Sequence, residues 1–130
     1  GAFQAGLAKG IQIAPVVLEA HRVMNEAVDD QTAIEPIYQR VPEGEQPALD
    51  AEVMSMPRVE VIDGVSVGFR QLDAIETTKV TKERAVLVLW RRGDHVAGFL
   101  YRKKRTIDLE VVVRETPRLF RLMNEAARPD

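Results

Sequence analysis

The sequence "AVLVLWRRGDHVAGFLY" (residues 85–101) contains two apolar runs separated by a short polar segment. Its first six residues are apolar at both odd and even positions, which is typical of a strand buried on both faces of a sheet. A Gly-Asp pair at positions 93–94 separates this run from a second apolar run over 96–101. A two-residue glycine turn between such runs indicates a β-hairpin. The stretch therefore predicts a central strand over 85–90 that pairs with a strand over 96–101.

A second hairpin is predicted upstream, in "RVEVIDGVSVGF" (residues 58–69). Asp63-Gly64 lies between alternating apolar residues, and Asp-Gly favours a type I′ turn because both central residues of that turn need positive φ. We expect residues 58–62 to pair with 65–69. Residues 71–84 fit helix, strand and loop about equally, so their structure is left open.

Both ends of the chain are predicted to be helical. Residues 14–28 have apolar side chains at helical spacing after Pro15, which suits a first helical turn. At the other end, "TIDLEVVVRE" (106–115) alternates like a half-exposed strand, and Thr116 before Pro117 indicates the N-cap of a C-terminal helix. Residues 102–105 would then be the turn between strands 96–101 and 106–115.

These elements predict a single α+β domain over residues 1–130, with residues 1–13 as a loose N-terminal segment. Residues 31–57 contain four prolines and are predicted to be a Pro-rich connection. Within it, residues 33–41 fit a short edge strand, but their structure is left open between strand, helix and loop. The fold would be an antiparallel sheet of about five strands, in two hairpin units, with an N-terminal and a C-terminal helix packed on it. The alternative is a small β-barrel or sandwich capped by the C-terminal helix, if 33–41 and 76–81 are strands.

The composition excludes several classes of function. The chain has no cysteine, so disulfides, thiol catalysis and Cys-ligated metals are excluded. It has two histidines, neither with a carboxylate or a second histidine at helical spacing, and no glycine-rich phosphate loop. We therefore expect no catalytic residue, metal or cofactor, and the sequence favours a non-enzymatic protein without settling the point. No apolar run is long enough to cross a membrane, so a cytoplasmic protein with no membrane partner is expected.

Charge is distributed unevenly along the chain. Residues 1–57 carry three basic and nine acidic side chains, whereas residues 58–130 carry fifteen basic and eleven acidic ones. Halves of opposite net charge favour self-association, and a strand that is apolar on both faces adds surface for a partner to bury.

Candidate ligand-binding residues come from the opening stretch and the residues that follow it. Trp90 and Phe99 are candidates for the wall of a pocket between sheet and helix. The cationic candidates are Arg91, Arg102, Lys103, Lys104 and Arg105. Strand 96–101 separates Arg91 from the other four by roughly 20 Å, so they predict two basic hairpin tips and not one patch.

Three functions follow from these observations. The leading hypothesis is a binding or regulatory module that acts through protein–protein interaction, as a homodimer or within an assembly. The second is a small-molecule-binding or lyase/isomerase-type domain with a pocket between sheet and helix. The third is a binder of polyanions or nucleic acid through the basic hairpin tips, which is not favoured because few aromatic side chains accompany the cations.

Overall fold

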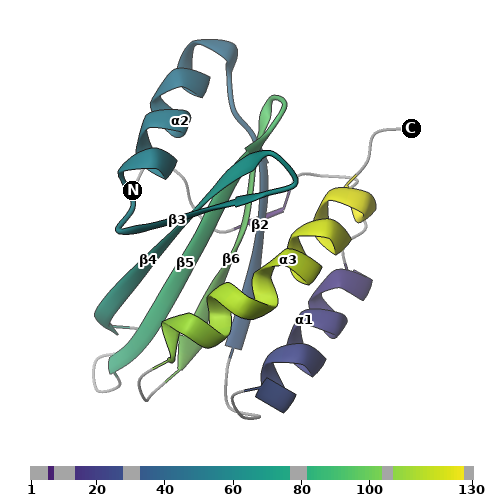
Figure 1. The fold of residues 1–130 in the computed structure, drawn as a ribbon, viewed down its shortest axis with the longest axis vertical. Coiled ribbons are helices and arrows are strands. Elements are labelled where there is room, and N and C mark those ends of the chain that lie inside the picture. Colours follow the sequence, from purple (N-terminus) through teal and green to yellow (C-terminus); the bar gives the residue numbers. More distant parts are fainter. Residues whose placement is uncertain (1–5, 8–13, 28–32, 77–81, 104–106, 128–130) are drawn as a thin grey trace.

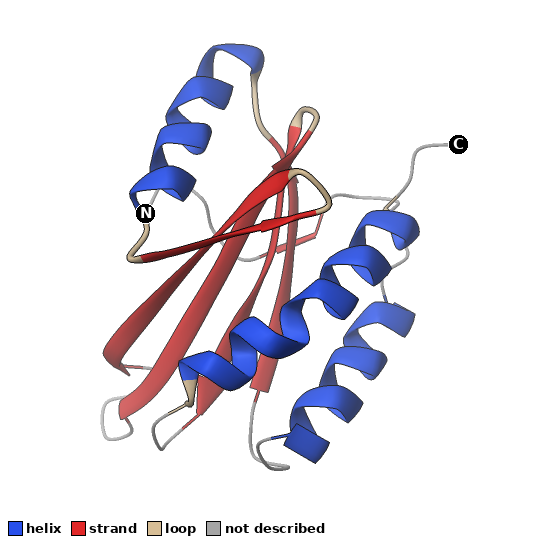
Figure 2. Ribbon diagram, in the orientation of Figure 1, coloured by secondary structure: helices blue, strands red, loops and turns tan. Residues whose placement is uncertain are grey.

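The computed structural model describes residues 6–7, 14–27, 33–76, 82–103 and 107–127. The chain is an α+β domain in which five antiparallel strands form an open sheet in the order β2-β6-β5-β4-β3, and a two-residue strand, β1, adds to β2 in parallel (Figures 1 and 2). In chain order the elements are β1 (Gly6–Leu7), α1 (Ala14–Ala27), β2 (Ala33–Arg40), a 3-10 turn η1 (Glu43–Glu45), α2 (Gln46–Ser55), β3 (Arg58–Ile62), β4 (Val65–Glu76), β5 (Lys82–Arg92), β6 (His95–Lys103) and α3 (Leu109–Ala126).

Both predicted hairpins are confirmed. Strand β5 lies between β4 and β6, and Arg92 pairs with His95 across the turn. Gly93 has φ 60°, the left-handed value that a type II′ turn requires at its first central residue. In the β3–β4 hairpin, Asp63 and Gly64 have φ 50° and 80°, as a type I′ turn requires.

The prediction that residues 31–57 form a connection misses helix α2, whereas residues 33–41, which the sequence leaves open between strand, helix and loop, contain strand β2. Strand β2 pairs with β6 along its whole length. Pro36 is tolerated in β2 because Phe99, its partner, exchanges hydrogen bonds with Val88, so the missing N–H of Pro36 points away from β6. Helix α2 begins with Pro47 in its first turn, where no N–H is needed.

The predicted strand over 106–115 is wrong, because helix α3 begins at Leu109. Its N-cap is Asp108, whose Oδ1 accepts a hydrogen bond of 2.9 Å from the Glu110 N–H. Thr116, predicted as the N-cap, is buried inside the helix, and Pro117 also lies in its interior. The buried positions recur at helical spacing from Val112 to Met123, and this burial outweighs the β-preference of three consecutive valines. The buried side chains are Val112, Thr116, Leu119, Phe120 and Met123.

The barrel alternative is also wrong, because β3 at one edge of the sheet does not pair with β1 or β2 at the other. The segment 71–84 is largely extended: β4 continues to Glu76 and β5 starts at Lys82, with a register shift between Leu72 and Ile75. Residues 77–81, and the part of the predicted basic turn at 104–105, lie outside the described residues.

The sheet has a different core on each face. Helices α1 and α3 lie side by side on one face (Figure 1) and cover a large aromatic cluster that includes Trp90, Phe99 and Phe120. Helix α2 packs on the opposite face, where Leu49, Val53 and Met56 meet Ile37, Leu89 and Val96 in a smaller cluster. The helix that covers the second face has ten residues, so it reaches only part of the sheet.

The start of α3 can be tested with two substitutions. Asp108→Ala removes the cap and should lower the free energy of unfolding by about 1 kcal/mol. Thr116→Val should leave it within about 0.5 kcal/mol, because the Thr116 Oγ1 hydrogen bond goes to the Val112 carbonyl, which the helix already satisfies. Chemical denaturation of both variants measures the difference. A larger loss for Thr116→Val than for Asp108→Ala would place the cap at Thr116 after all.

Candidate functional site

The two aromatic candidates are core residues. Trp90 and Phe99 are both 0% exposed, and the Trp90 ring lies 4.9 Å from the Phe120 ring of α3. The buried Trp90 Nε1 donates a hydrogen bond of 3.0 Å to Asn124 Oδ1, also on α3. The space between sheet and helix, where the sequence predicted a pocket, is therefore occupied at this point by packed side chains.

The cationic candidates lie at opposite ends of β6, and those that the structure describes make contacts within the chain. The Arg91 Nε donates to Asp50 Oδ1 at 2.8 Å. Arg102 forms an ion pair of 2.6 Å with Glu35, and Lys103, at the end of β6, also has a partner. Lys104 and Arg105 lie outside the described residues. The structure thus brings neither Arg102 nor Lys103 to Arg91.

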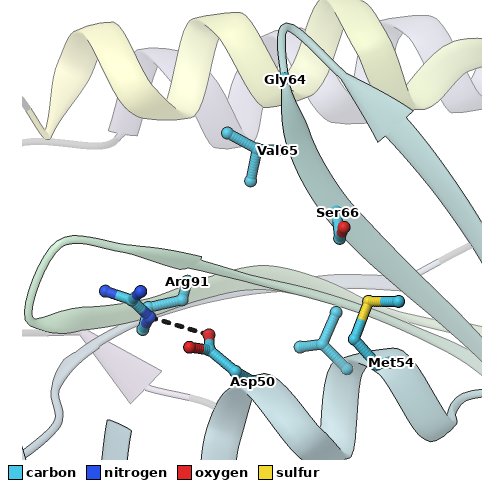
Figure 3. A pocket seen from close by; sticks show the side chains of 7 residues that line it. Asp50, Met54, Gly64, Val65, Ser66 and Arg91 are labelled. Carbon is cyan, nitrogen blue, oxygen red and sulfur yellow. Dashed lines mark hydrogen bonds and ion pairs between the residues drawn. The ribbon is translucent and has the colours of Figure 1, made fainter. Parts of the chain in front are cut away.

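A slot opens in the sheet between β4 and β5, close to Arg91. The β4–β5 ladder ends at the pair Gly68–Leu89, and residues 65–67 have no partners in β5. A hollow of about 290 Å³ lies between the separated strand ends (Figure 3). We call this hollow the slot. It is lined by Asp50, Val53, Met54, Gly64, Val65, Ser66 and Arg91.

One wall of the slot is the β3–β4 hairpin, which is held by α3. At the tip of the hairpin, Asp63 accepts two hydrogen bonds of 3.0 Å from Arg121. At its base, Arg58 Nη1 donates to Glu110 Oε1 at 2.7 Å. Ile62 and Val65 also pack into the core beneath α3. These contacts draw the hairpin towards α3 and away from the end of β5.

The other wall is the end of β5, which is held by α2. Arg91 is bound to Asp50 of α2 and also donates from Nη1 to the Gly93 carbonyl at 2.7 Å. A second hollow of about 390 Å³ shares Arg91 with the slot and includes Arg40, Glu43 and Asp94. Arg91 therefore borders two hollows.

Gly68 sets how closely α2 approaches the sheet at the closed end of the slot. A Cβ at this position would lie 2.4 Å from Met56 Sδ and 2.8 Å from the Val53 carbonyl oxygen. Only glycine lets the last turn of α2 sit directly on β4. Consequently α2 forms the floor of the slot at the point where β4 and β5 part.

The lining of the slot offers few reactive side chains. Ser66 contributes the only hydroxyl group of the lining, and no histidine or lysine lies among the lining residues to activate it. Elsewhere in the part of the chain that the structure describes, no three His, Asp or Glu side chains converge as a metal site would need. None of the described helices is long and apolar enough to span a membrane.

The sequence prediction missed the slot, although two signals pointed to its parts. Leu49, Val53 and Met56 follow helical spacing after the acidic residues of η1, which identifies α2. The small residues Ser66 and Gly68 lie on the same face of β4, which indicates a close neighbour. That the two strands part after Gly68 has no signal in the sequence.

The close contact at Gly68 predicts the outcome of adding one methyl group. Gly68→Ala should destabilise the protein by about 1–3 kcal/mol, because α2 has to shift away from β4. Gly44→Ala is the matched control, since nothing lies within 4 Å of the added Cβ. Thermal unfolding of the two variants measures the effect, and equal melting temperatures would contradict the contact.

The Asp63–Arg121 contact predicts a pH dependence. Hydrogen bonding to Arg121 lowers the pKa of the Asp63 carboxyl below its usual value. Because the folded pKa is depressed, the stabilisation is present above the unfolded pKa, about 3.9, and is lost as the pH falls through the folded pKa. Arg121→Ala should raise the Asp63 pKa, as measured by NMR titration. An unchanged pKa would mean that the ion pair does not form.

Comparison of the chain with known proteins gives no assignment. No protein-family model matches it, and neither do curated proteins or solved structures. The geometry and charge of the sheet face that α2 covers must therefore carry the functional argument.

Proposed function

We propose that this protein is a non-enzymatic binding module that acts through protein–protein interaction, with a second copy of the same chain as its first partner. The surface is the part of the α2-side sheet face that α2 does not cover. We call it the open face. It consists of Leu72, Leu87 and Leu100, with Arg70 and Glu35 beside them.

The observation that carries the proposal is the partial cover of this face. Among the described residues only α2 packs on it, and the buried α2 side chains reach one end of β5 and β6. Leu87 and Leu100 pair across β5 and β6 beside that cluster, pack against its edge and remain half-buried. Two paired leucines in the middle of a sheet, with Leu72 on the same face, are unusual on a surface that contacts only water.

The charges around this row favour a second copy of the chain. Across the four strands the row is Arg70, Leu87, Leu100 and Glu35, and Glu35 is already paired with Arg102 of its own chain at 2.6 Å. A two-fold axis along the strands reverses the row and sets Arg70 of one copy against the Glu35–Arg102 pair of the other. In this arrangement the leucines of the two copies meet, and Arg70 adds a second basic partner for Glu35.

The same geometry gives less support to the other two functions. A small-molecule site lined by Trp90 and Phe99 would need space that core packing occupies. A polyanion site would need cations that are not neutralised, whereas Arg91 and Arg102 already have acidic partners. Binding to a protein requires neither an open cavity at Trp90 and Phe99 nor cations that lack acidic partners.

The oligomeric state tests the proposal. Size-exclusion chromatography with light scattering should show a dimer for the natural chain. Leu87→Glu should weaken the dimer by about tenfold or more, because each copy would bury a carboxylate in the apolar row. Leu18→Glu, at a position 72% exposed on α1, is the control and should leave the dimer unchanged. Circular dichroism confirms that both variants fold.

A natural chain that is monomeric at every concentration would overturn self-association. A dimer that survives Leu87→Glu would place the interface elsewhere. Arg70→Glu, which turns the facing pair into two acids, should weaken the dimer severalfold and most strongly at low salt.

A further inference from the structure

The slot carries main-chain groups with no partner in the sheet. Ile62 and Val65 flank a two-residue turn, so they exchange hydrogen bonds, and alternation then directs the N–H and C=O of Ser66 away from β3. The same reasoning from Arg92 and His95 directs the N–H and C=O of Arg91 away from β6. These groups of Ser66 and Arg91 face the slot from its two walls.

The register shows that these four groups are a missing step of the ladder. Gly68 and Leu89 are the last pair that joins β4 to β5, and two residues further along the next hydrogen-bonded pair would be Ser66 with Arg91. That pair does not form, because α3 holds the β3–β4 hairpin and α2 holds Arg91. Two donors and two acceptors are thereby left in one hollow.

We propose that the slot binds an extended segment of a partner polypeptide as an added β-strand. The main chain of the segment would bond to Ser66 on one side and to Arg91 on the other, in place of the missing pair. The inference rests on the proposed function, since it makes the protein a binder of polypeptides. The added strand would bind at the slot, whereas the proposed dimer forms through the open face. An experiment can therefore exclude either proposal without excluding the other.

The lining defines which segments fit. The floor is apolar, from Val53 and from Met54, which is 59% exposed at the rim, and Val65 projects into the slot from the hairpin (Figure 3). Arg91 and Asp50 neutralise one another, so the lining presents no uncompensated charge. An uncharged or apolar side chain facing Met54 is therefore preferred. The unpaired strand ends are three residues long, which limits contact to roughly 10 Å of extended chain.

The free protein already allows a first measurement. Amide hydrogen exchange followed by NMR should be fast at Ser66 and Arg91, which have no ladder partner. It should be slow at Val67 and Trp90, whose N–H groups bond to β3 and β6. Slow exchange at both Ser66 and Arg91 would mean that their groups are bonded within the chain, and would overturn the proposal.

Binding is tested with a phage-displayed library of random linear heptapeptides. The library is selected on the natural chain, and peptides that recur are synthesised and titrated by NMR. Bound peptide should slow exchange at Ser66 and Arg91. Ser66→Pro, which removes only an N–H outside the ladder, should weaken binding by about tenfold. Ser66→Ala is the matched control, because it keeps the N–H and should bind within about twofold of the natural chain.

Several outcomes would overturn the proposal. They are the absence of any recurring peptide, equal binding by the proline variant, and binding that leaves exchange at Ser66 and Arg91 unchanged. If Ser66→Pro does not fold, Met54→Asp replaces it and should also weaken binding about tenfold, because it places a charge at the apolar rim. The dimer is measured separately by light scattering. A negative result for peptide binding at the slot therefore does not affect the proposed dimer interface, and a monomeric protein does not affect the proposed peptide site.

Discussion

Helix α3 contacts both the centre of the sheet and the hairpin at one of its edges. Its apolar side packs against Trp90 and Phe99 and so fixes the central hairpin. Its charged residues hold the β3–β4 hairpin through Glu110 and Arg121. One helix thus closes the main core and also holds the β3–β4 hairpin at one edge of the sheet.

The two faces of the sheet differ because the helices are unequal in number and length. Helices α1 and α3 lie together on one face, and an ion pair of 2.6 Å between Glu19 and Arg118 joins them. The other face has only α2 among the described elements. Both proposals follow from this imbalance: the open face is what α2 does not reach, and the slot is where α2 and α3 hold neighbouring strands apart.

Short sequence patterns predicted the two hairpin turns, because each turn depends on the residues at the turn itself. Asp63-Gly64 and Gly93-Asp94 mark both turns because their backbone conformations demand those residues. Residues 106–115 were predicted wrongly because the valines at 111–113 favour a strand in isolation, and only packing against the sheet makes them helical. Helix α2 was missed because the prolines of 31–57 indicate loop equally well. The slot forms where pairing between β4 and β5 ends. The contacts of the two strands with α2 and α3 determine that point, and no short sequence pattern indicates it.

Pro36 has a consequence for how this sheet behaves at high protein concentration. Its missing donor lies on the outer edge of β2, and the two residues of β1 cover Ile37 and Tyr38 next to it. An incoming strand cannot complete a ladder along that edge. Any chain that adds to the opposite side of the sheet therefore finds no second edge on which to repeat the addition. Edge-to-edge pairing of sheets can therefore use only β3, which limits it to two copies of the sheet.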